Sequence, residues 1–177
     1  IPATLRESVS GLRRHRLHRR AASAIEALRP DDYESLAYHY SQAGDEDRAR
    51  DFYEKAGDRA LAVFANPEAE RHYRAALEVT PSGPDRARLL EGVGDAMRRQ
   101  SRFNETLQIW REAIDLYRLQ REWESVARLY ARCARVAWEN GDVPLGLTIG
   151  AEGVAAVGDA PESPGLAELL HETGRAY

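Results

Sequence analysis

The side chains in this sequence that are capable of chemistry include five histidines, one cysteine and several neighbouring carboxylates. His15 and His18 lie three residues apart, which places them on one face of a helix, but the arginines around them would repel a metal cation. Cys133 occupies a position of the apolar pattern, so we interpret it as a packing residue rather than a nucleophile. Acidic pairs such as Asp45 and Glu46 stand at expected helix starts, where they complement the helix dipole.

Sequence motifs of catalysis do not occur. The chain has no Gly-rich phosphate loop, no G-x-S-x-G and no H-E-x-x-H. We therefore predict that the protein is not an enzyme and that it holds no metal and no cofactor.

Composition indicates a soluble domain with a continuous core. The 177 residues are 43% hydrophobic and 31% charged, and a net charge of −4 gives no general attraction to nucleic acid or to an anionic membrane. Of the 25 basic residues only Lys55 is a lysine. The single cysteine excludes an intramolecular disulfide, and no signal-peptide pattern or apolar run of roughly 20 residues is present. We expect a cytoplasmic location and no membrane contact.

The stretch from Tyr33 to Ala56 has the pattern of two amphipathic helices joined by a turn at Gly44. Large and small apolar residues alternate at helical spacing on both sides of the turn, so that two antiparallel helices can approach closely. The residues of this pattern are Tyr33, Leu36, Ala37 and Tyr40 before the turn, and Ala49, Tyr53 and Ala56 after it. Such a pair cannot bury its own apolar face and needs neighbours to stack on.

Beyond the loop 80–84 the pattern recurs at an offset of 40 residues. In the first helices Leu90, Tyr130 and Leu170 correspond, as do Gly94, Ala134 and Gly174, and Met97, Ala137 and Tyr177. In the second helices Phe103, Thr106, Trp110 and Ala113 correspond to Val143, Gly146, Gly150 and Gly153. The three glycines on one face of 144–157 favour close helix packing, with a flexible or ligand-facing segment as the alternative.

We predict an all-α fold, a right-handed superhelix of about nine or ten helices in antiparallel pairs. Residues 1–29 form basic linking helices and residues 30–177 form the repeat array, cut within its last repeat. The loop 80–84 is expected to be an ordinary loop. Whether 46–65 is one helix or two stays open. The last helix, 166–177, has no partner after it, so we expect exposed apolar surface there and a homodimer through that end.

The basic segment divides into a short helix over 3–9 and a longer one over 10–28, which Pro30 ends. The longer helix has an apolar stripe of Leu12, Leu17, Ala21, Ala22, Ile25 and Leu28. Its other faces carry Arg13, Arg14, His15, Arg16, His18, Arg19 and Arg20. We interpret them as a solvated face, or one docked on a neighbouring domain, and regard phosphate binding as the less favoured alternative.

The order aromatic, Leu, Tyr, turn Gly, Ala, aromatic, Ala in 33–56 resembles the tetratricopeptide repeat (TPR). The resemblance implies a concave groove lined by the first helix of each repeat. The groove residues it implies as partner-binding are Arg88, Asp95, Arg99, Arg128, Arg135, Trp138 and Arg175. Further positions are Glu34, Tyr38, Ser41, Gln42, Glu91, Arg98 and His171. This set would suit an acidic or aromatic peptide; ordinary solvated positions are the alternative.

Chaperone-binding members of the TPR family hold a C-terminal carboxylate with a Lys/Asn clamp. The clamp's Asn positions are here Tyr38, Asp95 and Arg135, so we expect no such clamp.

Residues 5–81, with LRRHRLHRRAASAIEAL ahead of the first repeat, also resemble a junction in large bacterial ATP-binding (STAND-type) regulators. These regulators carry LuxR-type or SARP-type DNA-binding domains, and some multidomain nucleotide cyclases share the junction. The resemblance implies a protein-interaction or signal-sensing domain of a bacterial transcriptional regulator. Its partner would be a protein, a peptide or another domain of the parent chain. A small-molecule inducer is the alternative, and nucleic-acid contact through the Arg/His helix is less favoured.

Overall fold

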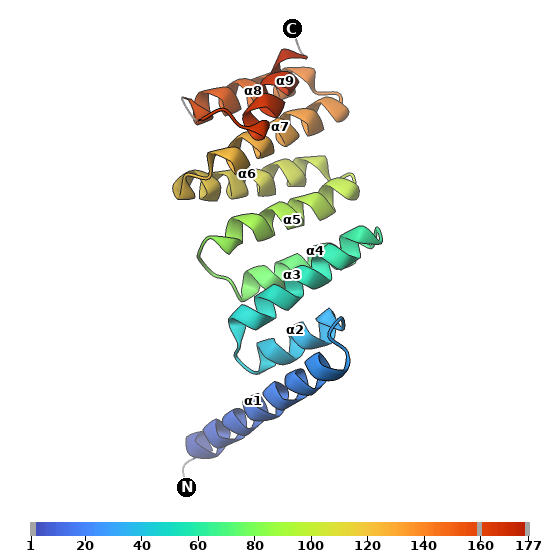
Figure 1. The fold of residues 1–177 in the computed structure, drawn as a ribbon, viewed down its shortest axis with the longest axis vertical. Coiled ribbons are helices and arrows are strands. Elements are labelled where there is room, and N and C mark those ends of the chain that lie inside the picture. The colour runs from blue at the N-terminus through green and yellow to red at the C-terminus, as the bar shows by residue number, and fades with distance from the viewer. Residues whose placement is uncertain (1–2, 159–160, 176–177) are drawn as a thin grey trace. The chain divides into compact units, whose positions relative to one another are not determined.

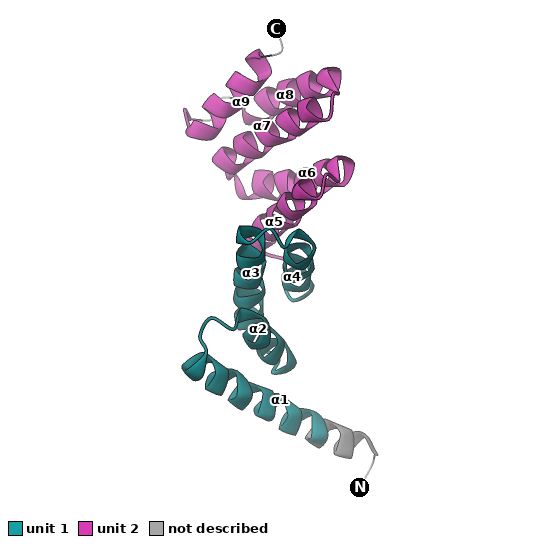
Figure 2. Ribbon diagram, turned by 90° about the vertical axis from the view of Figure 1, so that its right-hand side faces the viewer, with its two compact units in different colours: residues 1–81 teal, residues 82–177 magenta. Residues whose placement is uncertain are grey.

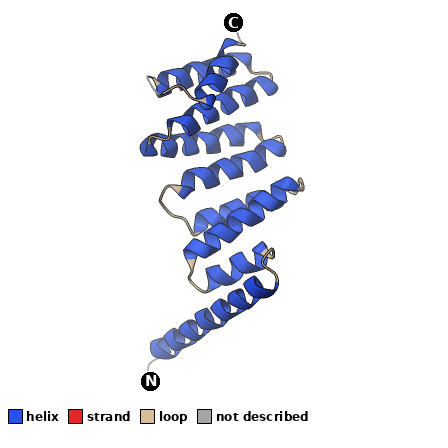
Figure 3. Ribbon diagram, in the orientation of Figure 1, coloured by secondary structure: helices blue, strands red, loops and turns tan. Residues whose placement is uncertain are grey.

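The computed structural model describes residues 3–158 and 161–175, with side chains from Ser10 onward. These residues form nine helices and no strand, and each helix follows the previous one through a short connection (Figures 1 and 3). The predicted all-α fold of antiparallel helix pairs is confirmed. Within the described residues, no helix has the length and apolar character needed to cross a bilayer.

The chain divides into two compact units, Ile1–Pro81 and Ser82–Tyr177 (Figure 2). The division lies in the loop 80–84, which the sequence analysis treated as an ordinary loop rather than a domain boundary. The boundary predicted after residue 29 falls inside unit 1, where helix α1 packs on α2.

Unit 1 contains four helices, which are α1 (Ala3–Leu28), α2 (Tyr33–Gln42), α3 (Glu46–Ala62) and α4 (Asn66–Glu78). The prediction of two helices within 3–28 is wrong, because α1 runs through Gly11 without a break. One glycine costs a helix only about 1 kcal/mol, and no proline lies between Ala3 and Leu28. α1 ends at Leu28, as Pro30 predicts.

Helix α3 packs on two neighbours, α2 and α4. It passes through Gly57 and ends at Ala62 rather than at residue 65, so 46–65 holds one helix and a turn. Gly57 is required because a Cβ there would lie 2.8 Å from the ring of Tyr73 on α4. α4 begins at Asn66, and Ala65 stands at its cap position, with no side-chain hydrogen bond to the cap.

The α2–α3 contact is built on aromatic stacking over small residues. The rings of Tyr40 and Phe52 stack with centroids 5.6 Å apart and planes inclined by 3°, while Ala37 and Ala49 are fully buried. The aromatic residue that α3 buries here is therefore Phe52, and Tyr53, which the sequence pattern favoured, is half-buried at the edge of this cluster.

Unit 2 contains five helices, which are α5 (Asp85–Arg99), α6 (Phe103–Gln120), α7 (Trp123–Glu139), α8 (Val143–Val157) and α9 (Pro164–Gly174). α6 packs on α5 and α7, and α9 packs on both α7 and α8. Trp110 of α6 is fully buried, and its indole fills the space where Gly94 of α5 would carry a Cβ. The glycine-against-aromatic contact of Gly57 and Tyr73 therefore recurs in unit 2.

The three glycines of α8 are all buried in helix contacts, which confirms the close-packing prediction. Trp138 of α7 fills the Cβ position of Gly146, and Thr173 of α9 lies 2.6 Å from that of Gly150. Tyr130 and Leu169 close on Gly153 in the same way. α8 thus carries glycine where α6 carries Thr106, Trp110 and Ala113, and side chains of α7 and α9 fill the space.

In the last helix, two adjacent leucines of α9 differ in exposure. Leu169 is fully buried and Leu170 is 52% exposed. Some apolar surface is therefore exposed on α9, while Tyr177 lies outside the described residues. The homodimer remains a prediction.

Candidate interaction site on helices α5, α7 and α9

The first helix of each pair in unit 2 is α5, α7 or α9. These three helices are joined by ion pairs between carboxylates and arginines. On α5, Glu91 receives hydrogen bonds from Arg128 Nη2 at 3.0 Å and from Arg132 Nη1 at 2.6 Å. Arg132 also donates to Asp95. Arg128 and Arg132 lie four residues apart on α7, so both face α5 from one side of the helix.

On its other side, α7 pairs with α9. Arg135 donates through Nε to Glu172 at 3.1 Å and through Nη2 to Glu168 at 2.8 Å. Glu172 is only 3% exposed, so its charge depends on the guanidinium beside it. At the start of α7, the side chain of Glu124 accepts a bond from the backbone N–H of Gly165 at 3.0 Å.

These contacts repeat with one separation along the chain. The pairs Glu91–Arg128, Asp95–Arg132 and Arg135–Glu172 are each 37 residues apart. The repeat offset is 40 residues, and the difference of three is close to one helical turn. Each pair therefore joins a residue of one helix to a position of the next first helix that lies one turn before its repeat equivalent. We call the set of three pairs the carboxylate–arginine ladder.

Charge neutralisation within the ladder changes the acidity of its members. Burial alone would raise the pKa of Glu91, but the hydrogen bond and charge of Arg128, together with Arg132, outweigh it and lower the pKa. Burial lowers the pKa of Arg132. The pKa of Arg135 is raised, chiefly by its hydrogen bond to Glu172. The carboxylate of Glu91 is therefore ionised and paired with its two arginines near neutral pH.

Aromatic rings lie beneath two of the guanidiniums. Arg132 is centred 4.3 Å from the ring of Trp110, and Arg175 is 5.6 Å from that of Trp138. Both distances are within the range of cation–π attraction. Trp110 also donates from Nε1 to the carbonyl oxygen of Glu91 at 3.2 Å.

A pocket of about 280 Å³ opens beside the ladder. It is lined by Arg98, Trp110, Arg132, Arg135, Val136 and Glu139. Arg98 approaches Glu139 at 3.8 Å, a distance too long for a hydrogen bond. Arg98, Arg132 and Arg135 each keep at least one N–H group without a hydrogen-bond acceptor among the described residues. The pocket therefore presents polar donors next to an indole ring.

The structure brings together only part of the predicted groove set. Arg128, Arg135 and Asp95 take part in the ladder, and Trp138 and Arg175 contact each other.

Arg88 and Arg99 are exposed on α5 outside the pocket lining, and Arg88 pairs with Asp85 at 3.1 Å. In unit 1, Glu34 pairs with Arg71 at 2.8 Å, and Tyr38 lies against His18. None of these four side chains contributes to the ladder.

Two residues of the ladder, Arg132 and Glu172, and the adjoining Glu168 are not among the positions that the sequence pattern indicated. Arg132 and Glu172 do carry a signal, because they stand 37 residues from Asp95 and Arg135, with opposite charge. The TPR groove positions point to residues that face a ligand, whereas these three pair with side chains of neighbouring helices.

Other candidate chemistry finds little geometric support within the described residues. Cys133 is buried, and burial raises the pKa of its thiol to about 12, which suits a packing residue. No group of three or more His, Cys, Asp or Glu side chains there is arranged to hold a metal ion. His18 faces His39 at 3.0 Å between their Nδ1 atoms rather than pairing with His15.

No protein-family model and no curated protein matches the chain, but solved structures do. The N-terminal domain of stress-induced protein-1 (STI-1) from C. elegans has a TM-score of 0.59 and 18% identity, over 72% of this chain and 94% of that one. BtubC (BKLC) from P. vanneervenii has a TM-score of 0.64 and 15% identity, over 100% of this chain and 84% of that one.

Aspartyl phosphate phosphatase F from Bacillus subtilis has a TM-score of 0.65 and 13% identity, over 93% of this chain and 45% of that one. The similar structures are TPR-like all-helical domains. The chain therefore has a TPR-like fold, and identities this low establish nothing beyond the fold.

Proposed function

We propose that the chain is a non-enzymatic protein-interaction domain that binds a partner peptide through the pocket beside the ladder. The observation that carries the proposal is the convergence of Arg98, Arg132 and Arg135 on one pocket with the indole of Trp110. N–H groups that lack acceptors favour a ligand with a carboxylate. A TPR-like fold supports the same conclusion, because stacked helix pairs create extended binding surfaces.

Arg98 is the residue best placed to receive the ligand. Its side chain is 41% exposed and its nearest carboxylate, Glu139, is 3.8 Å away. A carboxylate of the partner can replace that loose contact with a charge-assisted hydrogen bond. Arg132 and Arg135, by contrast, are already held by the ladder, so they offer fixed donors at little entropic cost. The ladder acts as the scaffold and Arg98 as the adjustable contact.

The role we favour for this domain is signal sensing in a bacterial transcriptional regulator located in the cytoplasm. The support is the resemblance of residues 5–81 to the junction of STAND-type regulators. In such a chain the partner is a protein, or another domain of the same chain, whose carboxylates reach the pocket.

A small anionic metabolite is the second candidate ligand. The pocket, at about 280 Å³, is close to the lower end of the about 300–1,000 Å³ typical of small-molecule sites. A compact compound with a carboxylate would fit the donors of the three arginines. Thermal-shift screening separates this case, since a ligand at 100 times its Kd adds about 2.7 kcal/mol of stability.

The test uses labelled peptides rich in Asp, Glu and Tyr, beside isosteric peptides with Asn and Gln in place of the acids. We expect the acidic peptides alone to bind, and Arg98→Gln to weaken them by about fivefold or more. The matched control is Arg111→Gln, because Arg111 on α6 is similarly exposed and pairs as loosely with Glu152, at 3.5 Å. Equal affinity of acidic and isosteric peptides, or equal effects of the two substitutions, would refute the pocket assignment.

A further inference from the structure

Helix α1 packs on α2 through one face only. Ala22 is fully buried, and His18 and Ile25 are half-buried. Leu17 and Leu28 point elsewhere and are 56% and 81% exposed. The apolar residues expected in one stripe therefore lie on two faces. On the second face Leu17, Ala24 and Leu28 are exposed, and Ala21 is half-buried beside α2.

The apolar residues of this second face are regularly spaced. Leu17, Ala21, Ala24 and Leu28 follow one another at intervals of four, three and four residues. This is the spacing of the a and d positions in a heptad, and it forms a straight seam along a helix. The seam is about 16 Å long, and its two central alanines leave room for the backbone of a second helix to approach closely. We call these four residues the α1 seam.

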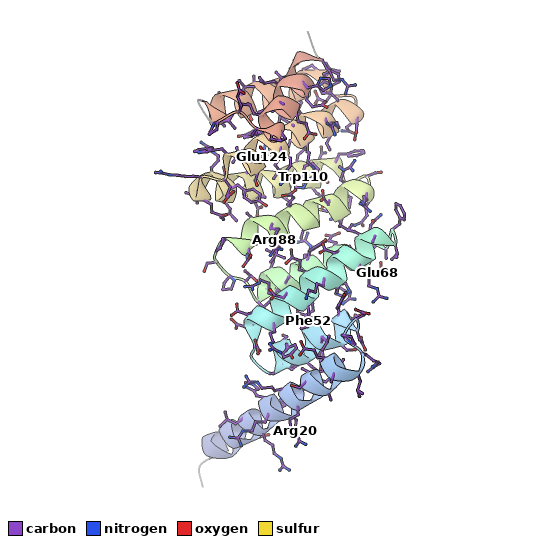
Figure 4. All side chains as sticks on the ribbon, viewed as in Figure 1. Arg20, Phe52, Glu68, Arg88, Trp110 and Glu124 are labelled. Carbon is purple, nitrogen blue, oxygen red and sulfur yellow. The ribbon has the colours of Figure 1, made fainter. Side chains whose placement is uncertain are left out.

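Arginines line the edge of the seam that lies away from α2, and they pair with no carboxylate of the described residues. Seven of the eight residues 13–20 are Arg or His. Arg13, Arg14, Arg16, Arg19 and Arg20 are exposed and form no ion pair within the described part of the chain. Arg20 extends from α1 on the side away from α2 (Figure 4). Arg13 and Arg20 stand at the g positions that flank a heptad seam, where charged residues select the partner helix.

We propose that the α1 seam docks an amphipathic α-helix with Leu or Ala on its apolar face and Glu or Asp at its flanking positions. The seam supplies the apolar contact, and the unpaired guanidiniums of Arg13 and Arg20, on the edge away from α2, supply ion pairs to the acidic flank of the partner helix. Charge complementarity fixes this choice, since every basic side chain of 13–20 lies within about two turns of the seam's first residue. This interaction is distinct from ligand binding at the pocket in unit 2.

Other occupants fit the same face less well. A second copy of α1 packed antiparallel would set the g-position arginines, Arg13 and Arg20, against their own copies, and like charges there oppose pairing. A parallel copy would need the e positions, His18 and Ile25, which already pack on α2. Nucleic acid would use the arginines and leave the apolar seam without a partner. A membrane surface favours bulky Trp, Phe and Leu side chains, whereas the middle of this seam is Ala21 and Ala24. An acidic helix alone uses both the charge and the small residues.

The test is a titration of the full 177-residue chain into a fluorescent peptide of about three heptads, with Leu and Ala at its seam and Glu at its flanks. Fluorescence anisotropy is expected to show saturable binding that weakens as salt is raised. Leu17→Glu should reduce the affinity by about tenfold or more, because it places a charge in the seam. Leu12→Glu is the matched control, since Leu12 is 62% exposed on the same helix but outside the seam; we expect a change of about twofold at most.

A scrambled peptide of the same composition separates docking from simple charge attraction, and it is expected to bind at least about tenfold more weakly. Equal binding of the scrambled peptide, equal effects of Leu12→Glu and Leu17→Glu, or no binding at low salt would each overturn the proposal. Tighter binding to duplex DNA or to phosphatidylserine vesicles, unchanged by Leu17→Glu, would overturn it in favour of those partners. Circular dichroism of both variants confirms that the helices are retained.

Discussion

Helices α1 and α7 use the same residue type in opposite ways. On α7, Arg128, Arg132 and Arg135 are held by carboxylates of α5 and α9. On α1, five arginines extend into solvent and pair with no carboxylate of the described residues. A count of arginines therefore says little about binding in a chain whose bases are nearly all arginine; the presence or absence of an internal acid decides whether the charge is structural or available.

The largest difference in the free energy of unfolding is expected between two variants, one that removes a paired arginine and one that removes an unpaired arginine. Arg135→Gln leaves the buried carboxylate of Glu172 with only the longer contact to Arg175, at 3.7 Å, and should cost about 3 kcal/mol. Arg20→Gln touches no partner and should change stability by less than about 0.5 kcal/mol. Urea unfolding followed by tryptophan emission, compared with far-UV circular dichroism, measures both.

A double variant sharpens this contrast. Arg135→Gln combined with Glu172→Gln removes both charges, so most of the lost stability should return. If Arg135→Gln and Arg20→Gln are equally mild, the ladder is not the structural element that its burial indicates.

An intermediate effect is expected from overpacking α3. Ala49 is fully buried between α2 and α3, and Ala49→Leu should cost about 1–3 kcal/mol. Ala24→Leu is its matched control, because Ala24 is exposed on α1 and the change should stay within about 0.5 kcal/mol. Thermal unfolding followed by circular dichroism compares them, and an unchanged midpoint for Ala49→Leu would contradict the α2–α3 contact.

The smallest expected difference between the two units is in how their stability changes as the pH falls. Burial lowers the pKa of both His39 and His72 in unit 1, assisted by the nearby charges of His18 and Arg71 respectively. The unfolded chain therefore binds protons first as pH falls below about 6.5, and unit 1 loses stability in that range. In unit 2 the lowered pKa of Glu91 has the same sign, but its effect begins only below about pH 4.5.

The three tryptophans, Trp110, Trp123 and Trp138, all lie in unit 2, which allows the two units to be followed separately. Between pH 6.5 and 5, urea midpoints from helical circular dichroism should fall while those from tryptophan emission stay constant. Parallel loss of both signals would show that the two histidines do not set this sensitivity.

Periodicity was sufficient to predict the fold but not the pairing of side chains. The repeats, the turn at Gly44 and the close packing of Gly146, Gly150 and Gly153 follow from the spacing of large and small residues, because helix contacts depend on volume. The helix break expected near Ser10 is wrong for a physical reason, because one glycine costs a helix only about 1 kcal/mol. The ladder pairs could not be predicted from the sequence, because they depend on a shift of one turn between neighbouring first helices. The pattern within a single helix does not show that shift.

The sharing of α3 between α2 and α4 also bears on how this chain can change in length. Beyond residue 82, a helix pair recurs every 40 residues, and each pair has its own first and second helix, so a gene could gain or lose one pair in frame and keep its contacts. In unit 1 the chain cannot be divided into two complete helix pairs, because α3 belongs to both the α2–α3 pair and the α3–α4 pair. Insertions and duplications should therefore accumulate after α4, and residues 33–78 should be inherited as one block.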